Sequence, residues 1–359
     1  MGFLNKIFKK KEDVKSPKGF NSLLVKEVVK VTADSVKVVF DIPSELSNKY
    51  VFIPGQYVTL SIMVDGKEER RSYSICSGPH ESLAVAIKAV ANGKVSNWAN
   101  QILKVGDEVF VSKPEGNFNW NTKDAFIVAF SAGSGVTPML SIAKHLESQI
   151  GDMRLFYGNK SESTTMFLSD LKALNNTKTQ LFLTQEIKEG TTNSRLDKDT
   201  ISELIKSDLN LLKADAYFLC GPEEMIKGGL ETLKLFGVSK EKVHYELFTT
   251  PVLLVEKQKE VTEVFKGTSH VTIILDQEKI ELKIDEKSPS ILDSLNGEGY
   301  DPPYSCRGGV CCSCKAKVIE GKATMKLNYS LTEQEVENGY ILTCQAQPAS
   351  EKVTISYDA

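Results

Sequence analysis

Four of the seven cysteines in the chain lie within nine residues, in the segment YSCRGGVCCSCKAKV. Cys306, Cys311 and Cys314 follow a C-x4-C-x2-C spacing, and Cys344 follows after 29 further residues. The sequence shows no long apolar core of an export signal, so we expect a reducing, cytoplasmic location. In that compartment clustered thiols usually bind metals or carry out redox chemistry instead of forming disulfides. The cysteines therefore predict a metal centre with four thiolate ligands.

The spacing is typical of a [2Fe–2S] cluster that takes three ligands from one loop and the fourth from a distant segment. Gly308 and Gly309 would let the backbone curl around the cluster and point amide N–H groups at its sulfurs. Structural zinc is the alternative, although zinc ribbons usually pair two Cys-x2-Cys knuckles and this sequence has one. No histidine lies in the loop, so a Rieske centre is not expected. Cys312 and Cys76 are interpreted as packed residues.

Composition limits the classes of partner. A chain of 359 residues predicts two or three domains. The net charge of −3 and the absence of a concentrated basic face argue against nucleic acid as a partner. No apolar run approaches the roughly 18 residues of a transmembrane segment. Residues 1–17 mix apolar side chains with five lysines; we expect a solvated basic tail, with a membrane-surface helix as the alternative.

Residues 18–120 show short alternating segments such as SVKVVFDI and QYVTLSIMVDGKEE, which predict an antiparallel β-barrel. Asp65-Gly66 and Asn92-Gly93 are read as hairpin turns. In residues 121–250, strand-like runs alternate with helical ones, which is typical of a doubly wound α/β domain with a parallel sheet. Residues 251–267 are interpreted as a linker. Residues 268–359 begin with a hairpin and a short helix from Ser290, which indicates a third small unit.

Two segments of the predicted barrel have residues suited to a flavin. A [2Fe–2S] cluster moves single electrons, whereas a nicotinamide coenzyme delivers two electrons at once as a hydride. Flavin is the usual group that accepts the two electrons and passes them on one at a time. In RRSYSICS, Tyr73 could present a flat face to the ring system and Ser74 could hydrogen-bond near its reactive nitrogen, N5. Arg71 could offer a planar fork to a pyrophosphate. Tyr73 could also be an ordinary packed strand aromatic.

The segment NGKVSNW places Gly93, Val95 and Ser96 at a predicted helix start, where backbone N–H groups and the helix dipole favour a phosphate. Gly93 alone could equally be a hairpin glycine.

The second predicted domain contains the segments expected for a nucleotide. In AFIVAFSAGSGVTPM, a strand runs into a turn at Gly133 to Gly135 and then a helix near Thr137-Pro138. In FLCGPEEM, Cys220, Gly221 and Pro222 end a later strand at the same sheet edge, where parallel sheets bind ligands. Cys220 could instead be a core residue.

A 2′-phosphate on the coenzyme would need cationic partners. Lys160, in YGNKSEST, and Arg195, in NSRLD, are the candidates, with solvated surface charges as the alternative. The coenzyme is NADPH or NADH, with a slight preference for NADPH.

Together these motifs resemble those of the ferredoxin–NADP reductase superfamily. From residue 18 to residue 359 the chain is most similar to the reductases of the phenylacetic-acid pathway (the phenylacetyl-CoA epoxidase type), which end in a plant-type ferredoxin domain. Those relatives usually have Ala at the position of Cys312. The resemblance implies a β-grasp third domain, FAD in preference to FMN, and Cys220 against the nicotinamide. It also places Glu246 and Phe248 near the flavin–nicotinamide stack, with Ser74, Cys220 and Glu246 as the catalytic residues.

The resemblance further implies an NAD(P)H-dependent reductase that passes electrons through FAD and the cluster to an oxygenase protein. A di-iron acyl-CoA epoxidase is favoured as the acceptor. The alternatives are a Rieske ring- or steroid-hydroxylase, and a general ferredoxin-like carrier without a dedicated partner. The linker would allow the third domain to swing between the flavin and the partner.

Overall fold

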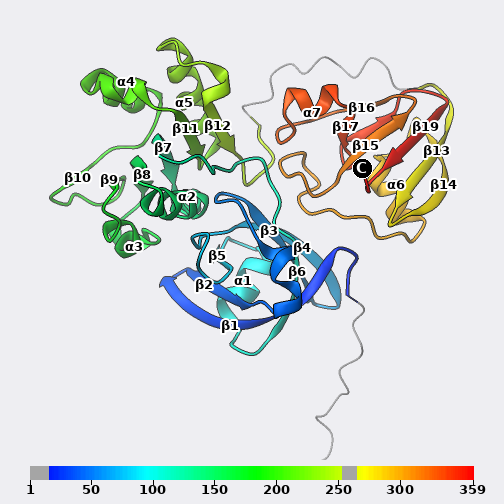
Figure 1. The fold of residues 1–359 in the computed structure, drawn as a ribbon, viewed down its shortest axis with the longest axis horizontal. Coiled ribbons are helices and arrows are strands. Elements are labelled where there is room, and N and C mark those ends of the chain that lie inside the picture. Colours follow the sequence, from blue (N-terminus) through cyan, green and yellow to red (C-terminus); the bar gives the residue numbers. More distant parts are fainter. Residues whose placement is uncertain (1–15, 253–264) are drawn as a thin grey trace, which may run out of the picture.

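The computed structural model describes residues 16–252 and 265–359, which form three units in chain order (Figure 1). The predicted basic tail falls mainly on residues 1–15, and the predicted linker mainly on residues 253–264, so both lie outside the described residues. The three-part fold class predicted from the sequence is confirmed: an antiparallel barrel, a parallel α/β sheet and a small α+β domain.

The first unit is an antiparallel sheet of six strands in the order β4-β3-β6-β1-β2-β5. A bridge between Ile75 and Val85 joins the end of β4 to β5, which closes the sheet into a barrel. Alternate residues such as Leu23, Val38 and Leu60 point inward and are fully buried, as the pleat of a half-buried strand requires. Its elements are β1 (Phe20–Thr32), β2 (Ser35–Asp41), η1 (Ser44–Tyr50), β3 (Tyr57–Val64), β4 (Lys67–Ser74), β5 (Ala84–Lys88), α1 (Lys94–Gln101) and β6 (Glu108–Ser112).

The two predicted hairpin turns had different outcomes. Asp65 and Gly66 join β3 to β4 with φ values of 51° and 74°, as a two-residue hairpin turn with both residues in the left-handed region requires. The prediction of a hairpin at Asn92-Gly93 is wrong, because Gly93 is the N-cap of α1. Asn92 alone takes a positive φ of 60° there, and the chain continues into a helix in place of a paired strand.

The second unit is a parallel sheet in the order β10-β9-β8-β7-β11-β12. The chain starts at the central strand β7, fills one side through β8 and β9, and then crosses to β11 on the other side. Its elements are β7 (Phe126–Ala132), η2 (Gly133–Gly135), α2 (Val136–Ser148), β8 (Asp152–Asn159), η3 (Glu162–Thr164), α3 (Leu168–Lys172), β9 (Thr177–Leu183), β10 (Thr191–Thr192), α4 (Lys198–Ser207), η4 (Leu209–Lys213), β11 (Ala216–Cys220), α5 (Glu223–Leu235), η5 (Lys240–Lys242) and β12 (Val243–Glu246).

Helices cover both faces of this sheet, which makes the domain doubly wound. Ile127 of β7 packs in a cluster with α2 and α3, and its neighbour Val128 packs in a second cluster with α4 and α5. Because β7 lies between β8 and β11, the strand order reverses at its carboxyl end. Ligands of open α/β sheets bind at such a switch point.

The third unit is a five-stranded sheet in the order β14-β13-β19-β15-β17, with a separate β16–β18 pair. The short helix predicted from Ser290 forms as α6, and Ser290 is its N-cap, because its hydroxyl accepts a hydrogen bond from the Asp293 N–H. Its elements are β13 (Thr268–Leu275), β14 (Glu278–Asp285), α6 (Ile291–Gly297), β15 (Lys315–Glu320), β16 (Ala323–Met325), α7 (Glu333–Glu337), β17 (Tyr340–Leu342), β18 (Ala346–Pro348) and β19 (Lys352–Ser356).

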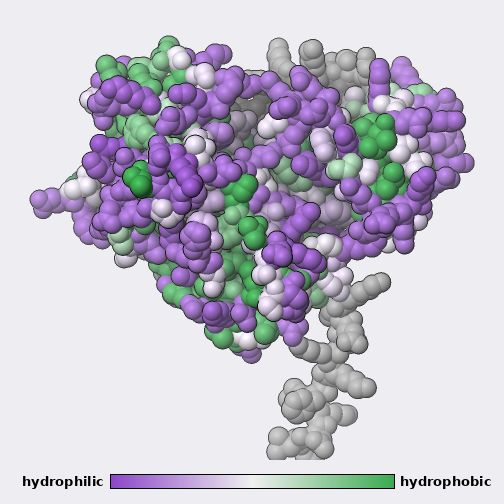
Figure 2. Space-filling view, viewed as in Figure 1, coloured by the Kyte–Doolittle hydropathy of each residue, from purple (hydrophilic) through white to green (hydrophobic). Residues whose placement is uncertain are grey.

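The barrel contacts both other units, which also contact each other (Figure 1). Val39 and Phe118 of the barrel share one apolar cluster with residues of β7 and α2. On the other side, the C-terminal unit is held to the barrel mainly by polar contacts, such as those of Tyr57 and Arg70. Figure 2 shows this face of the molecule as mostly hydrophilic, with hydrophobic residues gathered over the barrel.

The turn after β7 tolerates no side chain at Gly135. A Cβ atom added there would lie 2.0 Å from the backbone oxygen of Cys220, and backbone atoms cannot give way as a flexible side chain can. We therefore expect Gly135→Ala to lower the free energy of unfolding by about 1–3 kcal/mol, which is the usual range for overpacking. Thermal unfolding measures this. Gly297→Ala is the control, because no atom lies within 4 Å of its added Cβ, and an equal loss in both variants would contradict the expectation.

Candidate functional site

A pocket of about 700 Å³ lies where the three units meet. The end of β4 forms one wall, with Arg71, Ser72 and Ser74, and the segment after β12 forms a second wall. The cysteine loop forms the third wall, with Cys306 and Cys311 among its lining residues. Residues predicted separately for flavin chemistry and for cluster binding therefore line the same cavity.

On the barrel side, Ser74 and Glu246 link two domains. The Ser74 hydroxyl donates to the Glu246 carboxyl at 3.3 Å. Glu246 is partly exposed to the pocket, but the surrounding protein removes its carboxyl from bulk water and raises its pKa to about 8, an effect that the Ser74 hydrogen bond opposes. Glu246 is therefore mainly protonated at neutral pH, so it can hold a proton inside the pocket. Phe248 also lines the pocket and is 45% exposed.

The position of Tyr73 differs from those of Arg71 and Ser74, which line the pocket. Its ring packs against the barrel core and it is not among the side chains that line the 700 Å³ pocket. The predicted contact between Tyr73 and a flavin ring therefore remains a prediction.

Arg71 and the start of α1 lie close together, as a pyrophosphate site requires. Arg71 is half exposed and lies 3.2 Å from Glu69, whose other oxygen lies 2.6 Å from the Lys94 ammonium. Lys94 and then Arg71 lower the pKa of Glu69. Lys94, at the start of α1, and Arg71 therefore belong to one ion-pair network through Glu69. Within the same segment, a Cβ on Gly93 would lie 2.4 Å from the Ser96 Oγ.

Sequence reasoning missed Lys94. The residue occupies the first variable position of the Gly93-x-x-Ser96 motif, and a cation beside a predicted phosphate-binding helix start was the available signal.

The nucleotide-side predictions converge at the switch point of the parallel sheet. Gly133 has φ 56°, and Gly135 contacts the backbone of Cys220 so closely that only glycine fits. Thr137 and Pro138 are buried in the first turn of α2, and the Thr137 hydroxyl donates to the Ser134 oxygen.

Cys220 ends β11 beside Glu246 of β12, its partner in strand register. The thiol is fully buried, and burial together with the neighbouring carboxyl raises its pKa well above the ordinary value, so it is neutral. Gly221 follows at a position where a Cβ would lie 2.8 Å from Met225 and 3.0 Å from the Ala132 nitrogen, and Pro222 caps α5.

The two candidate phosphate-binding cations lie further out on the same edge of the sheet. Lys160 follows β8 and is exposed. Arg195 precedes α4 and forms a loose ion pair of 3.6 Å with Glu224, and both side chains are about 70% exposed. Their predicted role toward a 2′-phosphate stays a prediction.

The four predicted ligands of the C-terminal domain, Cys306, Cys311, Cys314 and Cys344, come together in two pairs. The Sγ atoms of Cys306 and Cys311 are 3.0 Å apart, and the thiols of Cys314 and Cys344 interact with each other. The Cys311 thiol, assisted by the Gly308 N–H at 3.3 Å, lowers the pKa of Cys306 to about 6. Amide and thiol groups that donate hydrogen bonds to sulfur stabilise the thiolate form that binds a metal.

This two-by-two arrangement fits a cluster of two irons, each with two cysteine ligands, better than one tetrahedral zinc ion. Within residues 16–252 and 265–359, no three His, Cys, Asp or Glu side chains are grouped as a single ion would need. Cys312 points its Sγ toward the Ser330 oxygen at 3.4 Å, so it contacts none of the paired thiols, as predicted.

The loop glycines act partly as predicted. Gly309 has a positive φ of 74°, which lets the backbone curl, and so does Arg307, at 54°. Gly308 lies close to the nucleotide domain, because a Cβ there would lie 2.0 Å from the Oγ1 of the exposed Thr250, which would have to rotate away.

Comparisons with known proteins agree with this arrangement. Three family models match in order: an oxidoreductase FAD-binding domain over residues 22–120, an oxidoreductase NAD-binding domain over residues 130–229, and a 2Fe-2S iron-sulfur cluster binding domain over residues 273–349. No helix in the described part of the chain has the length and apolar character needed to cross a membrane.

Two curated relatives match along nearly their whole length. One component of the 1,2-phenylacetyl-CoA epoxidase from Escherichia coli is 36% identical, with 95% of this chain and 98% of the relative covered. The ferredoxin reductase component of 3-ketosteroid-9-alpha-monooxygenase from Rhodococcus rhodochrous is 31% identical, with 96% and 99% covered.

Among solved structures, phthalate dioxygenase reductase matches with a TM-score of 0.59 at 22% identity, covering 94% of this chain and 98% of its own. An intact type IV self-sufficient cytochrome P450 monooxygenase matches with a TM-score of 0.70 at 18% identity, covering 94% of this chain and 41% of its own. Both support the fold and the order of the three domains. An FAD-binding barrel, an NAD-binding domain and a C-terminal [2Fe–2S] domain follow one another in this chain. The chain belongs to the family of oxidoreductases that are the ferredoxin reductase components of oxygenases.

Proposed function

We propose that this reductase supplies a di-iron acyl-CoA epoxidase with electrons from NAD(P)H. The observation that carries the proposal is the shared pocket, in which the β4 motif and Glu246 face Cys306 and Cys311 across one cavity. When bound, FAD accepts a hydride from the coenzyme and releases its two electrons singly to the [2Fe–2S] cluster. The 36% identity to a component of an epoxidase favours that class of acceptor.

The barrel would hold the flavin through residues at its open end. Arg71, Lys94 and the backbone N–H groups at the start of α1, including those of Val95 and Ser96, suit the two phosphates. Ser74 would orient the reactive edge of the ring. Glu246 would keep a proton within the pocket, since its pKa of about 8 leaves it protonated at neutral pH.

The parallel sheet would place the nicotinamide over that edge. At Gly133 a side chain is absent, which would let the coenzyme approach the turn closely, and the neutral thiol of Cys220 lies fully buried at the neighbouring strand end. A neutral thiol can lie against an aromatic ring without adding negative charge beside the hydride that is transferred. Cys306, Cys311, Cys314 and Cys344 would then hold the cluster.

A second candidate acceptor is a Rieske steroid or ring hydroxylase. The 31% identity to a ketosteroid monooxygenase reductase over almost the full chain favours it. Reconstitution with each oxygenase class separates the two candidates, because only the true partner will turn over its substrate with NAD(P)H and this reductase.

Replacement of one cluster ligand tests the electron route. We expect Cys306→Ser to remove most of the cluster absorbance and to abolish substrate oxygenation in the reconstituted system. Ferricyanide reduction by NAD(P)H should survive, because the flavin and nucleotide residues are untouched. Cys312→Ser, in the same loop but directed at Ser330, is the matched control and should keep both the cluster and oxygenation. Full oxygenase support by the Cys306 variant would refute the route.

The raised pKa of Glu246 predicts a pH-dependent stability. Its carboxyl has a pKa of about 8 in the folded protein against 4.5 for an ordinary glutamate, so the folded state binds a proton that the unfolded chain releases. This contribution is full below about pH 4.5 and is lost as the pH rises through 8. Glu246→Gln should therefore flatten the decline in Tm between pH 5 and pH 9 by several degrees. An exposed control, Glu189→Gln, should leave the decline unchanged; parallel curves for all three proteins would contradict the assignment.

Coenzyme choice is tested at the two exposed cations. If Lys160 and Arg195 bind a 2′-phosphate, the double variant Lys160→Ala, Arg195→Ala should raise the KM for NADPH by about tenfold, the effect of losing roughly 1.4 kcal/mol. The kcat/KM for NADH should change less than twofold. Lys178→Ala, an exposed lysine on β9, is the control. A wild-type preference for NADH of tenfold or more would overturn the NADPH assignment.

A further inference from the structure

Arg70 precedes the flavin motif and is buried between two domains. Its side chain is only 1% exposed, although a lone arginine is rarely buried. The Nε atom donates to Glu68 within the barrel at 2.6 Å, and one terminal nitrogen donates to Asp301 of the C-terminal domain, also at 2.6 Å. The other terminal nitrogen reaches the Pro302 oxygen at 3.4 Å. One guanidinium group therefore holds carboxylates from two domains at once.

The same guanidinium contacts the cysteine loop. The Cζ atom of Arg70 lies 4.4 Å from the ring centroid of Tyr304, and that of Arg307 lies 4.5 Å from the same ring. Cations over an aromatic face are attracted by its quadrupole, more strongly when water is excluded. Tyr304 stands two residues before Cys306, so Arg70 fixes the segment that leads into the predicted cluster ligands.

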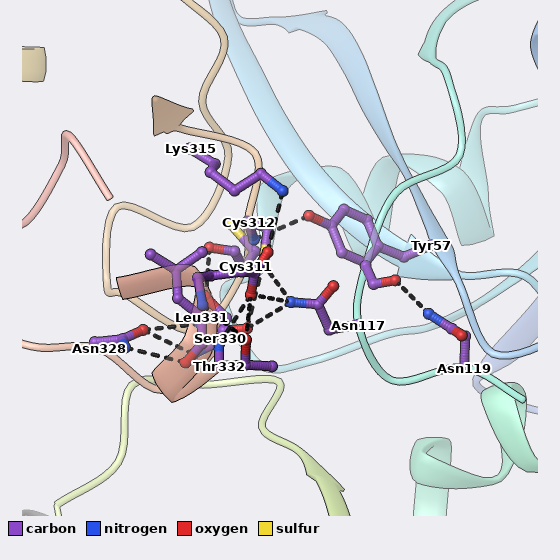
Figure 3. A network of polar contacts seen from close by, with 12 residues as sticks. Tyr57, Asn117, Asn119, Cys311, Cys312, Lys315, Asn328, Ser330, Leu331 and Thr332 are labelled. Carbon is purple, nitrogen blue, oxygen red and sulfur yellow. Dashed lines mark hydrogen bonds and ion pairs between the residues drawn. The ribbon is translucent and has the colours of Figure 1, made fainter. Parts of the chain in front are cut away.

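A second set of contacts joins the two domains on the other side of the loop. The Tyr57 hydroxyl accepts from the Cys312 N–H at 3.0 Å and lies 3.2 Å from the Ser313 hydroxyl. Asn117 donates to the Ser330 oxygen at 3.1 Å (Figure 3). These contacts are hydrogen bonds between uncharged groups, whereas Arg70 is a buried charged group between the domains.

We propose that Arg70 is a positioning residue, a latch that docks the C-terminal domain so that Cys306 and Cys311 line the flavin pocket. The inference rests on the proposed function and adds to it the residue that sets the geometry of flavin-to-cluster transfer. Each transfer removes one electron from the reduced flavin and adds one to the cluster, which the oxygenase then reoxidises. Arg70 exchanges neither electron nor proton.

The chemistry of the latch suits reversible docking. Burying an arginine carries a desolvation penalty that offsets much of its attraction to the two carboxylates, so such a pair specifies geometry more than it adds net stability. Asp301 is 39% exposed, so water can replace its contact when the domains separate. Glu68 would remain paired with Arg70 on the barrel.

The first test measures electron transfer in the FAD- and cluster-loaded protein. Asp301→Asn and wild type are mixed anaerobically with NAD(P)H, and flavin and cluster reduction are followed separately. We expect flavin reduction within twofold of wild type and cluster reduction slowed at least about tenfold, since loss of one partner of a buried charge pair carries a large penalty. Asp285→Asn, which removes the charge of an exposed carboxylate whose contact is local, with the Lys287 N–H, is the matched control and should behave as wild type.

The second test measures whether the C-terminal domain is docked on the other two domains. Among the residues that the structure describes, two exposed ion pairs cross into the C-terminal domain, Lys240 with Glu333 and Lys18 with Asp276, and a carbodiimide can join each pair covalently. Asp301→Asn should lower the yield of both cross-links severalfold, measured by peptide mass spectrometry. The cross-link between Lys198 and Glu231, within the nucleotide domain, should keep its yield.

The outcomes separate the two hypotheses. If the wild-type flavin is reduced but its cluster is not, the proposed function fails. If wild type transfers electrons and Asp301→Asn matches it in rate or in cross-link yield, the latch is refuted. Should Asp301→Asn fail to fold, Arg70→Lys decides: it keeps a cation but lacks the fork, and an unchanged rate of cluster reduction would refute the latch.

Discussion

Electron transfer weakens steeply with distance, and this constraint explains why three independently folded units converge on one pocket. Each unit provides one wall: the end of β4, the segment after β12, and the loop of Cys306 and Cys311. The barrel and the nucleotide-binding domain share an apolar cluster. The C-terminal domain is attached by hydrogen bonds, one buried arginine and exposed ion pairs, and its Val310 and Tyr329 pack against a second apolar cluster in the nucleotide-binding domain. Many contacts of the unit that exchanges electrons with another protein are thus ones that water can replace.

Two acidic groups at and beside the pocket stay uncharged near neutral pH. Glu246, which lines the pocket, stays protonated, and Cys220, its neighbour in the sheet, stays a neutral thiol, because burial penalises both anions. A site that handles a hydride benefits from this, since a nearby thiolate or carboxylate would raise the energy of added negative charge. Arg71 and Lys94 supply positive charge at the other end, where phosphates would lie.

Much of this site could be predicted from the sequence, because its parts are local. The ligand spacing of Cys306 to Cys314, the turn at Gly133 to Gly135 and the capping of α6 each depend on residues a few positions apart. The error at Asn92-Gly93 arose because a glycine that ends a turn also suits a helix N-cap, and only the packing of α1 on the barrel decides between them. Neither the interdomain partners of Tyr57 and Arg70 nor the contact of Ser74 with Glu246 could be predicted, because each joins segments more than a hundred residues apart.

The contact between Gly308 and Thr250 has a consequence for the rate at which the C-terminal domain returns to the pocket. Thr250 stands at the end of the nucleotide domain, and its hydroxyl occupies the space that a side chain at position 308 would need. The connection between these two domains therefore begins beside the cysteine loop itself. A connection anchored next to the docking site would keep the effective concentration of the loop high. If the C-terminal domain leaves the pocket to reach a partner, its return is then an intramolecular event that does not depend on protein concentration.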